Sequence, residues 1–138
     1  MILLDTDILT RYLAGHPRVL ERVRLAEEVP ATTVISRIEV LQGRFASILK
    51  ADDGAQLERA RDLLERTEAT LARITVIPLD SAAATEFDRL RADRKLRKIG
   101  HADLLFAAIT LAHRATLVTH NLRHFRQVPR LRLENWAD

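Results

Sequence analysis

The sequence contains no cysteine. This absence excludes disulfide bonds, thiolate chemistry and cysteine-rich zinc sites. No apolar run approaches the roughly 18 residues that a membrane-spanning helix needs. The opening residues Met-Ile-Leu-Leu-Asp carry no basic stretch and no cleavage site, so they do not resemble a secretory signal. We therefore expect a cytoplasmic protein without a membrane partner.

What the chain does contain is typical of one folded domain. Its 138 residues are 47% hydrophobic and 30% charged. This composition excludes disordered and fibrous classes, and the length is sufficient to bury a sizeable core. We find no internal repeat, linker or low-complexity segment, so a single domain over residues 1–138 is expected.

Charge is divided unevenly along the chain. Residues 1–88 hold 11 basic and 15 acidic side chains, whereas residues 89–138 hold 11 basic and 4 acidic ones. Of the 22 basic residues, 19 are arginine. Arginine forks bind phosphate bidentately, so a polyanionic partner is one interpretation. A solvated surface enriched in arginine by coding bias is the other.

Short apolar stretches alternate with amphipathic ones along the whole chain. The stretches that predict strands are 2–4, 30–33, 75–77 and 116–119, with 131–133 as a candidate fifth. The helical patterns cover about 5–13, 17–28, 36–49, 55–73, 80–96 and 101–113. This alternation predicts an α/β fold, a three-layer α/β/α sandwich with a mainly parallel central sheet.

Polar side chains follow several of the predicted strands. Asp5 comes after the first strand and Glu39 one turn into the helix after the second, while Thr119 and Asn121 follow the fourth. Asp103 is the only acid in a helix that is otherwise apolar. Ligands of open α/β sheets bind beyond the carboxyl ends of the strands. Carboxylate and amide oxygens suit Mg²⁺ or Mn²⁺ better than zinc.

Each of these residues also has a purely structural interpretation. Asp5 can cap the first helix, and Ser36 with Glu39 fits a capping box. Asp103 can offset a helix dipole, and Asn121 can be a turn residue. Taken together the residues favour a site, because an unpaired buried carboxylate such as Asp103 is costly without a cation.

Four segments, in this order, resemble the motifs of PIN-domain ribonucleases of the VapC toxin family. They are Leu-Leu-Asp-Thr-Asp-Ile-Leu at 3–9, Ile-Ser-Arg-Ile-Glu-Val-Leu-Gln-Gly at 35–43, Ile-Gly-His-Ala-Asp-Leu-Leu-Phe-Ala-Ala-Ile at 99–109, and Leu-Val-Thr-His-Asn-Leu-Arg-His-Phe at 117–125. The resemblance covers essentially the whole chain. It implies a PIN-like fold and a Mg²⁺- or Mn²⁺-dependent endoribonuclease that leaves 5′-phosphate and 3′-hydroxyl ends.

The resemblance also implies roles for individual residues. Asp5, Glu39 and Asp103 match the acidic metal ligands of the family, and Thr119 with Asn121 matches its Thr-x-Asp/Asn pair. Asn121 is neutral and His124 stands where an acid is common, so one firmly held metal is expected and a second stays open. Candidates for contact with the RNA substrate are Thr6, Arg94, Lys95, Arg97, Lys98 and His124.

Partners follow from the resemblance as well. VapC toxins are inhibited by a small VapB-type antitoxin that packs over the active-site groove, and they usually form homodimers or hetero-oligomers with it. The amphipathic stretches near 8–28 and 36–73 can supply apolar surface for either contact, or can serve only the core of the domain itself.

Other interpretations remain to be weighed against the ribonuclease. A catalytically weak nucleic-acid-binding or scaffold domain with a degenerate metal site is compatible with the neutral Asn121. A response-regulator receiver is disfavoured, because Ile77-Pro78-Leu79 occupies the place of its phospho-accepting Asp. A DNA nuclease is disfavoured by the small size of the chain. A zinc site at His120 and His124 has no third ligand.

Overall fold

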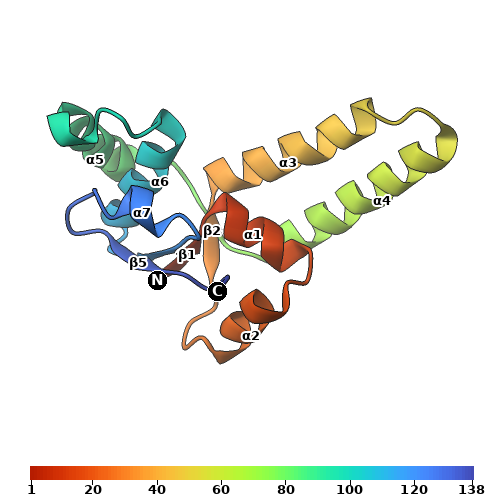
Figure 1. Ribbon diagram of the computed structural model, residues 1–138, viewed down its shortest axis with the longest axis horizontal. Coiled ribbons are helices and arrows are strands. Elements are labelled where there is room, and N and C mark those ends of the chain that lie inside the picture. The colour runs from red at the N-terminus through yellow and green to blue at the C-terminus, as the bar shows by residue number, and fades with distance from the viewer.

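The computed structural model describes residues 1–138 and has a five-stranded sheet at its centre (Figure 1). The strands are β1 (Ile2–Leu4), β2 (Ala31–Thr33), β3 (Val76–Ile77), β4 (Thr116–Val118) and β5 (Arg132–Glu134). Their order is β3-β2-β1-β4-β5, and every neighbouring pair is parallel. The predicted parallel sheet, including its fifth strand, is therefore confirmed.

The helices are α1 (Thr6–Leu13), α2 (Pro17–Leu25), α3 (Val34–Leu49), α4 (Gly54–Leu71), α5 (Ser81–Ala92), α6 (His101–Ala112) and α7 (Leu122–Phe125). A short 3₁₀ turn, η1 (Arg94–Leu96), lies between α5 and α6. None of the helices combines the length and the apolar character needed to cross a membrane.

The alternating side chains of the strands divide the core into two layers. Leu3 and Leu117 point to the face that packs against α5, α6 and α7, where Phe106, Ile109 and Phe125 are buried. Neighbouring residues in β1 and β4, Leu4 and Val118, point to the opposite face. There they pack against residues of α1 to α4 such as Ile8, Val19, Val40 and Leu71. Because strand side chains alternate between faces, consecutive apolar residues supply both cores of the predicted three-layer sandwich.

Helix α6 is buried on nearly every side, as its composition predicts. Leu104, Ala107 and Ala108 belong to a third apolar cluster with Leu90 of α5 and Val128. A helix that is apolar all round must be enclosed, because exposed apolar surface costs free energy in proportion to its area. The single acid of this helix, Asp103, lies in its first turn at the edge of that cluster.

The bounds of several helices differ from the sequence prediction, among them α3, which begins at Val34 instead of residue 36. Helix α2 ends at Leu25 instead of residue 28, because Ala26 is extended at its C-terminus. Helix α5 ends at Ala92, and Asp93 then caps the separate turn η1. Helix α7 was not expected, since four residues are too few to establish a helical period.

Helices α3 and α4 form a long hairpin that extends away from the sheet (Figure 1). Only the part of this hairpin close to the sheet contributes to the core, through Val40 and Leu71. The outer part leaves apolar side chains exposed, including Phe45 and Leu49, which are 58% and 69% exposed.

Candidate active site

The candidate site lies where strands β1 and β4 end. Asp5 follows β1 directly, and its backbone N–H donates to the Val118 carbonyl at 3.0 Å, which extends the sheet by one residue. Thr119 follows β4, and its N–H donates to the Glu134 carbonyl at 2.9 Å. Both side chains are buried, at 7% and 0% exposure. Their position at the carboxyl edge of a parallel sheet agrees with the expected location of a ligand site.

Asp5 has a structural role at this edge. Its Oδ1 accepts a hydrogen bond from the Ile8 backbone N–H at 2.9 Å, so it is the N-cap of α1. Burial raises the pKa of the Asp5 carboxyl above its ordinary value of 3.8. The Ile8 N–H and the Thr119 hydroxyl lower that pKa in part, whereas the negative charges of Asp7 and Asp103 raise it further. The capping interpretation is therefore correct without removing Asp5 from the site.

Asp103 reaches the same region from the first turn of α6. Burial raises its pKa, His124 lowers it, and the nearby charge of Glu39 raises it. The charge of Glu39 therefore acts on the pKa of Asp103, and the charge of Asp103 acts on the pKa of Asp5. Three acids from α3, α6 and the end of β1 therefore share one electrostatic neighbourhood. No acid here has a lysine or arginine as an ion-pair partner.

Glu39 is held by a hydroxyl from α1. Thr6 Oγ1 donates to Glu39 Oε1 at 2.6 Å and lies 3.0 Å from Ser36 Oγ. The capping-box interpretation of Ser36 and Glu39 is wrong. Helix α3 starts at Val34, and its N-cap is Thr33, whose Oγ1 accepts from the Ser36 N–H at 3.2 Å. Glu39 is consequently not needed at the helix start and is exposed beside Thr6.

His124 and Asn121 close the site from the segment after β4. His124 Nδ1 lies 3.1 Å from Asp103 Oδ2 and 3.1 Å from Asn121 Nδ2. The Asn121 backbone N–H donates to Thr119 Oγ1 at 3.0 Å, which fixes the turn leading into α7. The imidazole Nδ1 therefore lies between an acid of α6 and an amide of the β4–α7 turn, and it donates to the acid when protonated or accepts from the amide when not.

The basic residues that are candidates for contact with RNA lie outside the cluster of acids. Arg94, Lys95, Arg97 and Lys98 are all exposed in and after η1, the segment that leads into α6. None of them forms an ion pair with a site carboxylate, and Lys95 contacts Asp93 only through its backbone N–H. They remain candidates for an RNA contact in the approach to Asp103.

Ser36 is the site residue that the sequence analysis missed. It is fully buried, and its hydroxyl contacts Thr6, which holds Glu39. A signal for it existed in Thr33, an alternative helix cap three residues earlier. Had Thr33 been taken as the cap, Ser36 would have been placed inside the helix as a buried hydroxyl that needs a partner.

A divalent cation fits the donors of this site, although the side chains are not arranged around one. No three acidic or histidine side chains stand in metal-binding geometry. Glu39 is instead turned toward Thr6, and Asp103 toward His124. Asp103 raises the pKa of Asp5 and Glu39 raises the pKa of Asp103, and a cation would offset this like-charge repulsion. Asp5 and Asp103, with Glu39, are the residues that can hold it.

Comparison with known proteins assigns the fold to a family. A family model described as PIN domain matches residues 2–131. The chain therefore belongs to the PIN-domain family, whose nucleases depend on divalent metal ions. Ribonuclease VapC2 of Rickettsia felis is 37% identical over 136 residues, covering 97% of this chain and 96% of the relative. Within the PIN-domain family the chain belongs to the VapC ribonucleases, as the four motifs predicted.

Further relatives agree over the full length. The tRNA(fMet)-specific endonuclease VapC of Shigella flexneri is 29% identical, covering 98% of this chain and 97% of the relative. The crystal structure of VapBC2 from Rickettsia felis bound to a promoter DNA fragment has a TM-score of 0.79 at 28% identity, with 99% of each chain covered. DNA-bound VapBC from Salmonella typhimurium has a TM-score of 0.79 at 26% identity, covering 98% and 97%.

Proposed function

We propose that this chain is the toxin of a toxin–antitoxin pair and acts as a metal-dependent endoribonuclease in the cytoplasm. Residues 1–138 form its single PIN-like nuclease domain. The observation that carries the proposal is the meeting of Asp5, Glu39 and Asp103 at the carboxyl edge of the sheet. The names of the relatives, which are ribonucleases and a transfer-RNA endonuclease, support RNA as the substrate.

Each residue has a defined task in this proposal. Asp5 and Asp103 hold the cation, which when bound lowers the pKa of a water ligand and polarises a phosphoryl oxygen. Glu39 completes the ligand set or orients the attacking water, and Thr6 sets its position through the 2.6 Å hydrogen bond. The Thr119 hydroxyl positions Asp5, and the Asn121 amide positions His124. Arg94, Lys95, Arg97 and Lys98 face the RNA backbone on the approach.

The cation in this proposal is Mg²⁺ or Mn²⁺, because carboxylate oxygens suit either ion. His124 Nδ1 lies 3.1 Å from Asp103 Oδ2, so these two side chains contact each other directly. Cleavage assays with each ion in turn decide between the two.

The proposed protein partner is a VapB-type antitoxin. Two solved relatives of comparable length are VapBC complexes. In this chain the α3–α4 hairpin presents exposed apolar side chains, including Ile38, Phe45, Leu49 and Leu57. Exposed apolar patches of this kind mark protein interaction surfaces. The same surface can support a homodimer.

An RNA cleavage assay tests the nuclease. Purified chain is incubated with total transfer RNA and ribosomal RNA in Mg²⁺, in Mn²⁺ or in chelator, beside an Asp5→Asn control. We expect discrete fragments with 5′-phosphate and 3′-hydroxyl ends that require metal and are absent with the variant. If the wild type leaves all RNA intact while mass spectrometry detects no antitoxin in the preparation, the nuclease proposal is wrong. Metal-dependent stabilisation without turnover would then identify a nucleic-acid-binding module.

A further inference from the structure

Arginine side chains gather at the amino edge of the sheet, opposite the carboxylates. A hollow of about 310 Å³ is lined there by Arg89 of α5, by Arg114 and Arg130 in the turns before β4 and β5, and by Arg132 of β5. We call these four residues the arginine hollow. Leu111 and Ala115 contribute its apolar lining, and Glu86 contributes one carboxylate. The four arginines come from three separate segments, so the cluster is a product of folding and not of a local charge run.

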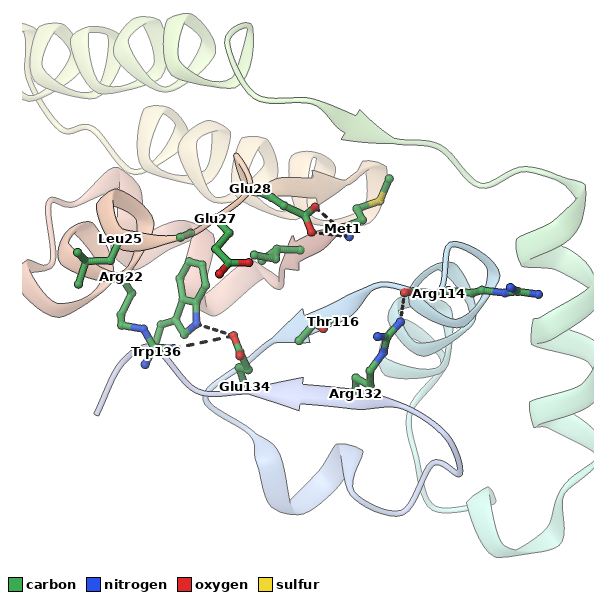
Figure 2. Close-up of a pocket in the computed structure, with 12 residues that line it drawn as sticks. Met1, Arg22, Leu25, Glu27, Glu28, Arg114, Thr116, Arg132, Glu134 and Trp136 are labelled. Atoms are coloured by element: carbon green, nitrogen blue, oxygen red, sulfur yellow. Dashed lines mark hydrogen bonds and ion pairs between the residues drawn. The ribbon is translucent and has the colours of Figure 1, made fainter.

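Most of the positive charge in the arginine hollow is uncompensated. Arg89 pairs with Glu86, but Arg114, Arg130 and Arg132 form no ion pair with any carboxylate. Arg132 Nη2 donates to the Arg114 carbonyl, and Figure 2 shows the Arg132 side chain directed to that backbone oxygen while the Arg114 side chain extends away. A guanidinium has five N–H donors, so this one bond orients Arg132 and leaves other donors free.

The backbone at two of these arginines is unusual. Arg114 has φ 51° and Arg130 has φ 66°, and they are the only non-glycine residues of the chain with positive φ. Glycine adopts this conformation without penalty, whereas a side chain with a Cβ atom is strained in it. A turn alone would be served better by glycine. Both arginines line the same hollow, so each turn brings a positive charge to it.

We propose that the arginine hollow binds backbone phosphates of RNA at a second contact, distinct from the carboxylate site. Guanidinium forks match phosphate oxygens in pairs, and three unpaired forks around one hollow form a site for a polyanion. An acidic peptide is less suited, because the hollow has little apolar surface for its side chains. The inference rests on the proposed RNA substrate.

The location of the arginine hollow defines which RNA can use it. From Ala115 to Thr119 the chain advances four residues along β4, which is about 13 Å at the usual strand rise. An RNA that occupies both edges must pass around the sheet. A folded RNA can do so, whereas a short single strand at the carboxylates cannot. The arginine hollow therefore contributes to the binding of folded RNA and leaves the chemical step unchanged.

A triple variant removes the guanidinium groups with little cost to the fold. Arg114→Gly and Arg130→Gly relieve the positive φ, and Arg132→Gln retains an N–H donor for the Arg114 carbonyl. The matched control is Arg18→Gln with Arg59→Gln and Arg73→Gln, three exposed arginines without ion-pair partners. Both triple variants lose the same net charge, so a difference between them reports position and not charge alone.

The measurement is the binding of a folded transfer RNA in chelator, where no cleavage occurs, over a series of salt concentrations. We expect the hollow variant to bind about tenfold more weakly and its log K against log salt slope to fall by about 2, since each phosphate contact contributes roughly 0.7–0.9. The control should change less than about twofold. Cleavage of a short single-stranded RNA with metal should be equal for wild type and both variants.

Two results would overturn the inference. Equal weakening of both triple variants would assign the effect to net charge, and loss of short-RNA cleavage in the hollow variant would place these arginines in the active site. A wild type that binds the folded RNA but cleaves neither substrate contradicts the nuclease proposal instead. In that case the comparison of the two triple variants still decides the arginine hollow.

Discussion

Asp5 combines a stabilising hydrogen bond with a destabilising charge. Its carboxylate caps α1 through the Ile8 N–H, which on an exposed helix would stabilise the fold by about 1 kcal/mol. Here the same carboxylate is buried near Asp103, and burial raises its pKa. A raised folded-state pKa means that ionisation opposes folding at neutral pH. The residue is therefore retained at a cost in stability, as is common for catalytic groups.

Asp5→Asn should therefore make the protein more stable at neutral pH. Asparagine is as good a helix cap as aspartate, so the bond from the Ile8 N–H can persist without the buried charge. We expect a gain of about 1 kcal/mol at pH 7. The gain should be absent below the ordinary pKa of 3.8, where the wild-type carboxyl is protonated in both states, and should grow as pH rises through the raised folded-state pKa.

Urea unfolding in chelator from pH 3 to pH 7 measures this gain. Asp53→Asn is the matched control, because Asp53 caps α4 by accepting from the Gln56 N–H at 2.8 Å but is exposed. It should show no comparable gain. A less stable Asp5→Asn at pH 7 would mean that the carboxylate is favourably solvated or paired in the folded state.

At the scale of the elements, period and composition were sufficient to predict most of the fold. Short apolar or β-branched stretches located the strands, and the uniformly apolar stretch of α6 predicted its burial. The helix boundaries that were predicted wrongly depend on the backbone conformation of single residues. Ala26 leaves the helix although Ala, Glu and Glu at 26–28 are compatible with it, and Val29 before Pro30 is already confined to extended conformations.

The site was predictable to the extent that it depends on strand ends. Asp5 and Thr119 follow β1 and β4, so parallel topology brings them to one edge. The contact of Thr6 with Glu39 was not predictable, because it depends on how α1 packs against α3. The capping-box rule wrongly assigned Glu39 to the start of the helix. Ser36 and Glu39 have the spacing of a capping box, but Thr33 makes the actual cap.

The contact between α1 and α3 predicts a positioning role for Thr6. Thr6→Val preserves the shape and β-branching of the side chain but removes the hydroxyl that donates to Glu39 Oε1. We expect RNA cleavage to fall roughly tenfold or more, as for other partners that orient metal-site carboxylates. The free energy of unfolding should fall by about 1–3 kcal/mol, because the buried Ser36 hydroxyl loses its partner.

Cleavage rate and metal affinity, the latter by calorimetry, measure the effect of Thr6→Val. Thr10→Val is the control on the same helix, because its hydroxyl donates to the Thr6 carbonyl at 2.8 Å and contacts no acid. Thr6→Ser should recover most of the activity. Equal activity of Thr6→Val and the wild type would show that Glu39 needs no support from α1.

The whole molecule is asymmetric in its apolar surface. The sheet and its two helical layers enclose their apolar side chains, whereas the α3–α4 hairpin carries Phe45 and Leu49 into the solvent (Figure 1). Helix α3 also holds Glu39, which lies about one and a half turns before Phe45 on the same helix. A partner that covers the hairpin therefore lies close to the carboxylates. Binding of the antitoxin to the hairpin is thus expected to inhibit RNA cleavage.

Phe45→Glu combined with Leu49→Glu should disrupt association without unfolding the chain. These side chains are 58% and 69% exposed, so the folded monomer loses little burial when they are replaced. We expect binding of the antitoxin encoded by the neighbouring reading frame to weaken about 1,000-fold, because truncating two central apolar anchors costs roughly 2 kcal/mol each. Self-association should weaken in parallel if the dimer uses the same surface. RNA cleavage by the isolated chain should persist, and the antitoxin should no longer suppress it.

Light scattering and calorimetry with that antitoxin separate the possible outcomes. Leu25→Glu combined with Val29→Glu is the matched control, since these side chains are 60% and 88% exposed outside the hairpin. Equal weakening by both double variants would point to a diffuse apolar effect. A hairpin variant that still binds and is still inhibited would place the antitoxin elsewhere, and the exposed face of α3 would then need another occupant. If the hairpin variant cleaves RNA but is no longer inhibited by the antitoxin, the apolar surface of α3 is the surface through which the antitoxin controls the active site, which includes Glu39 on the same helix.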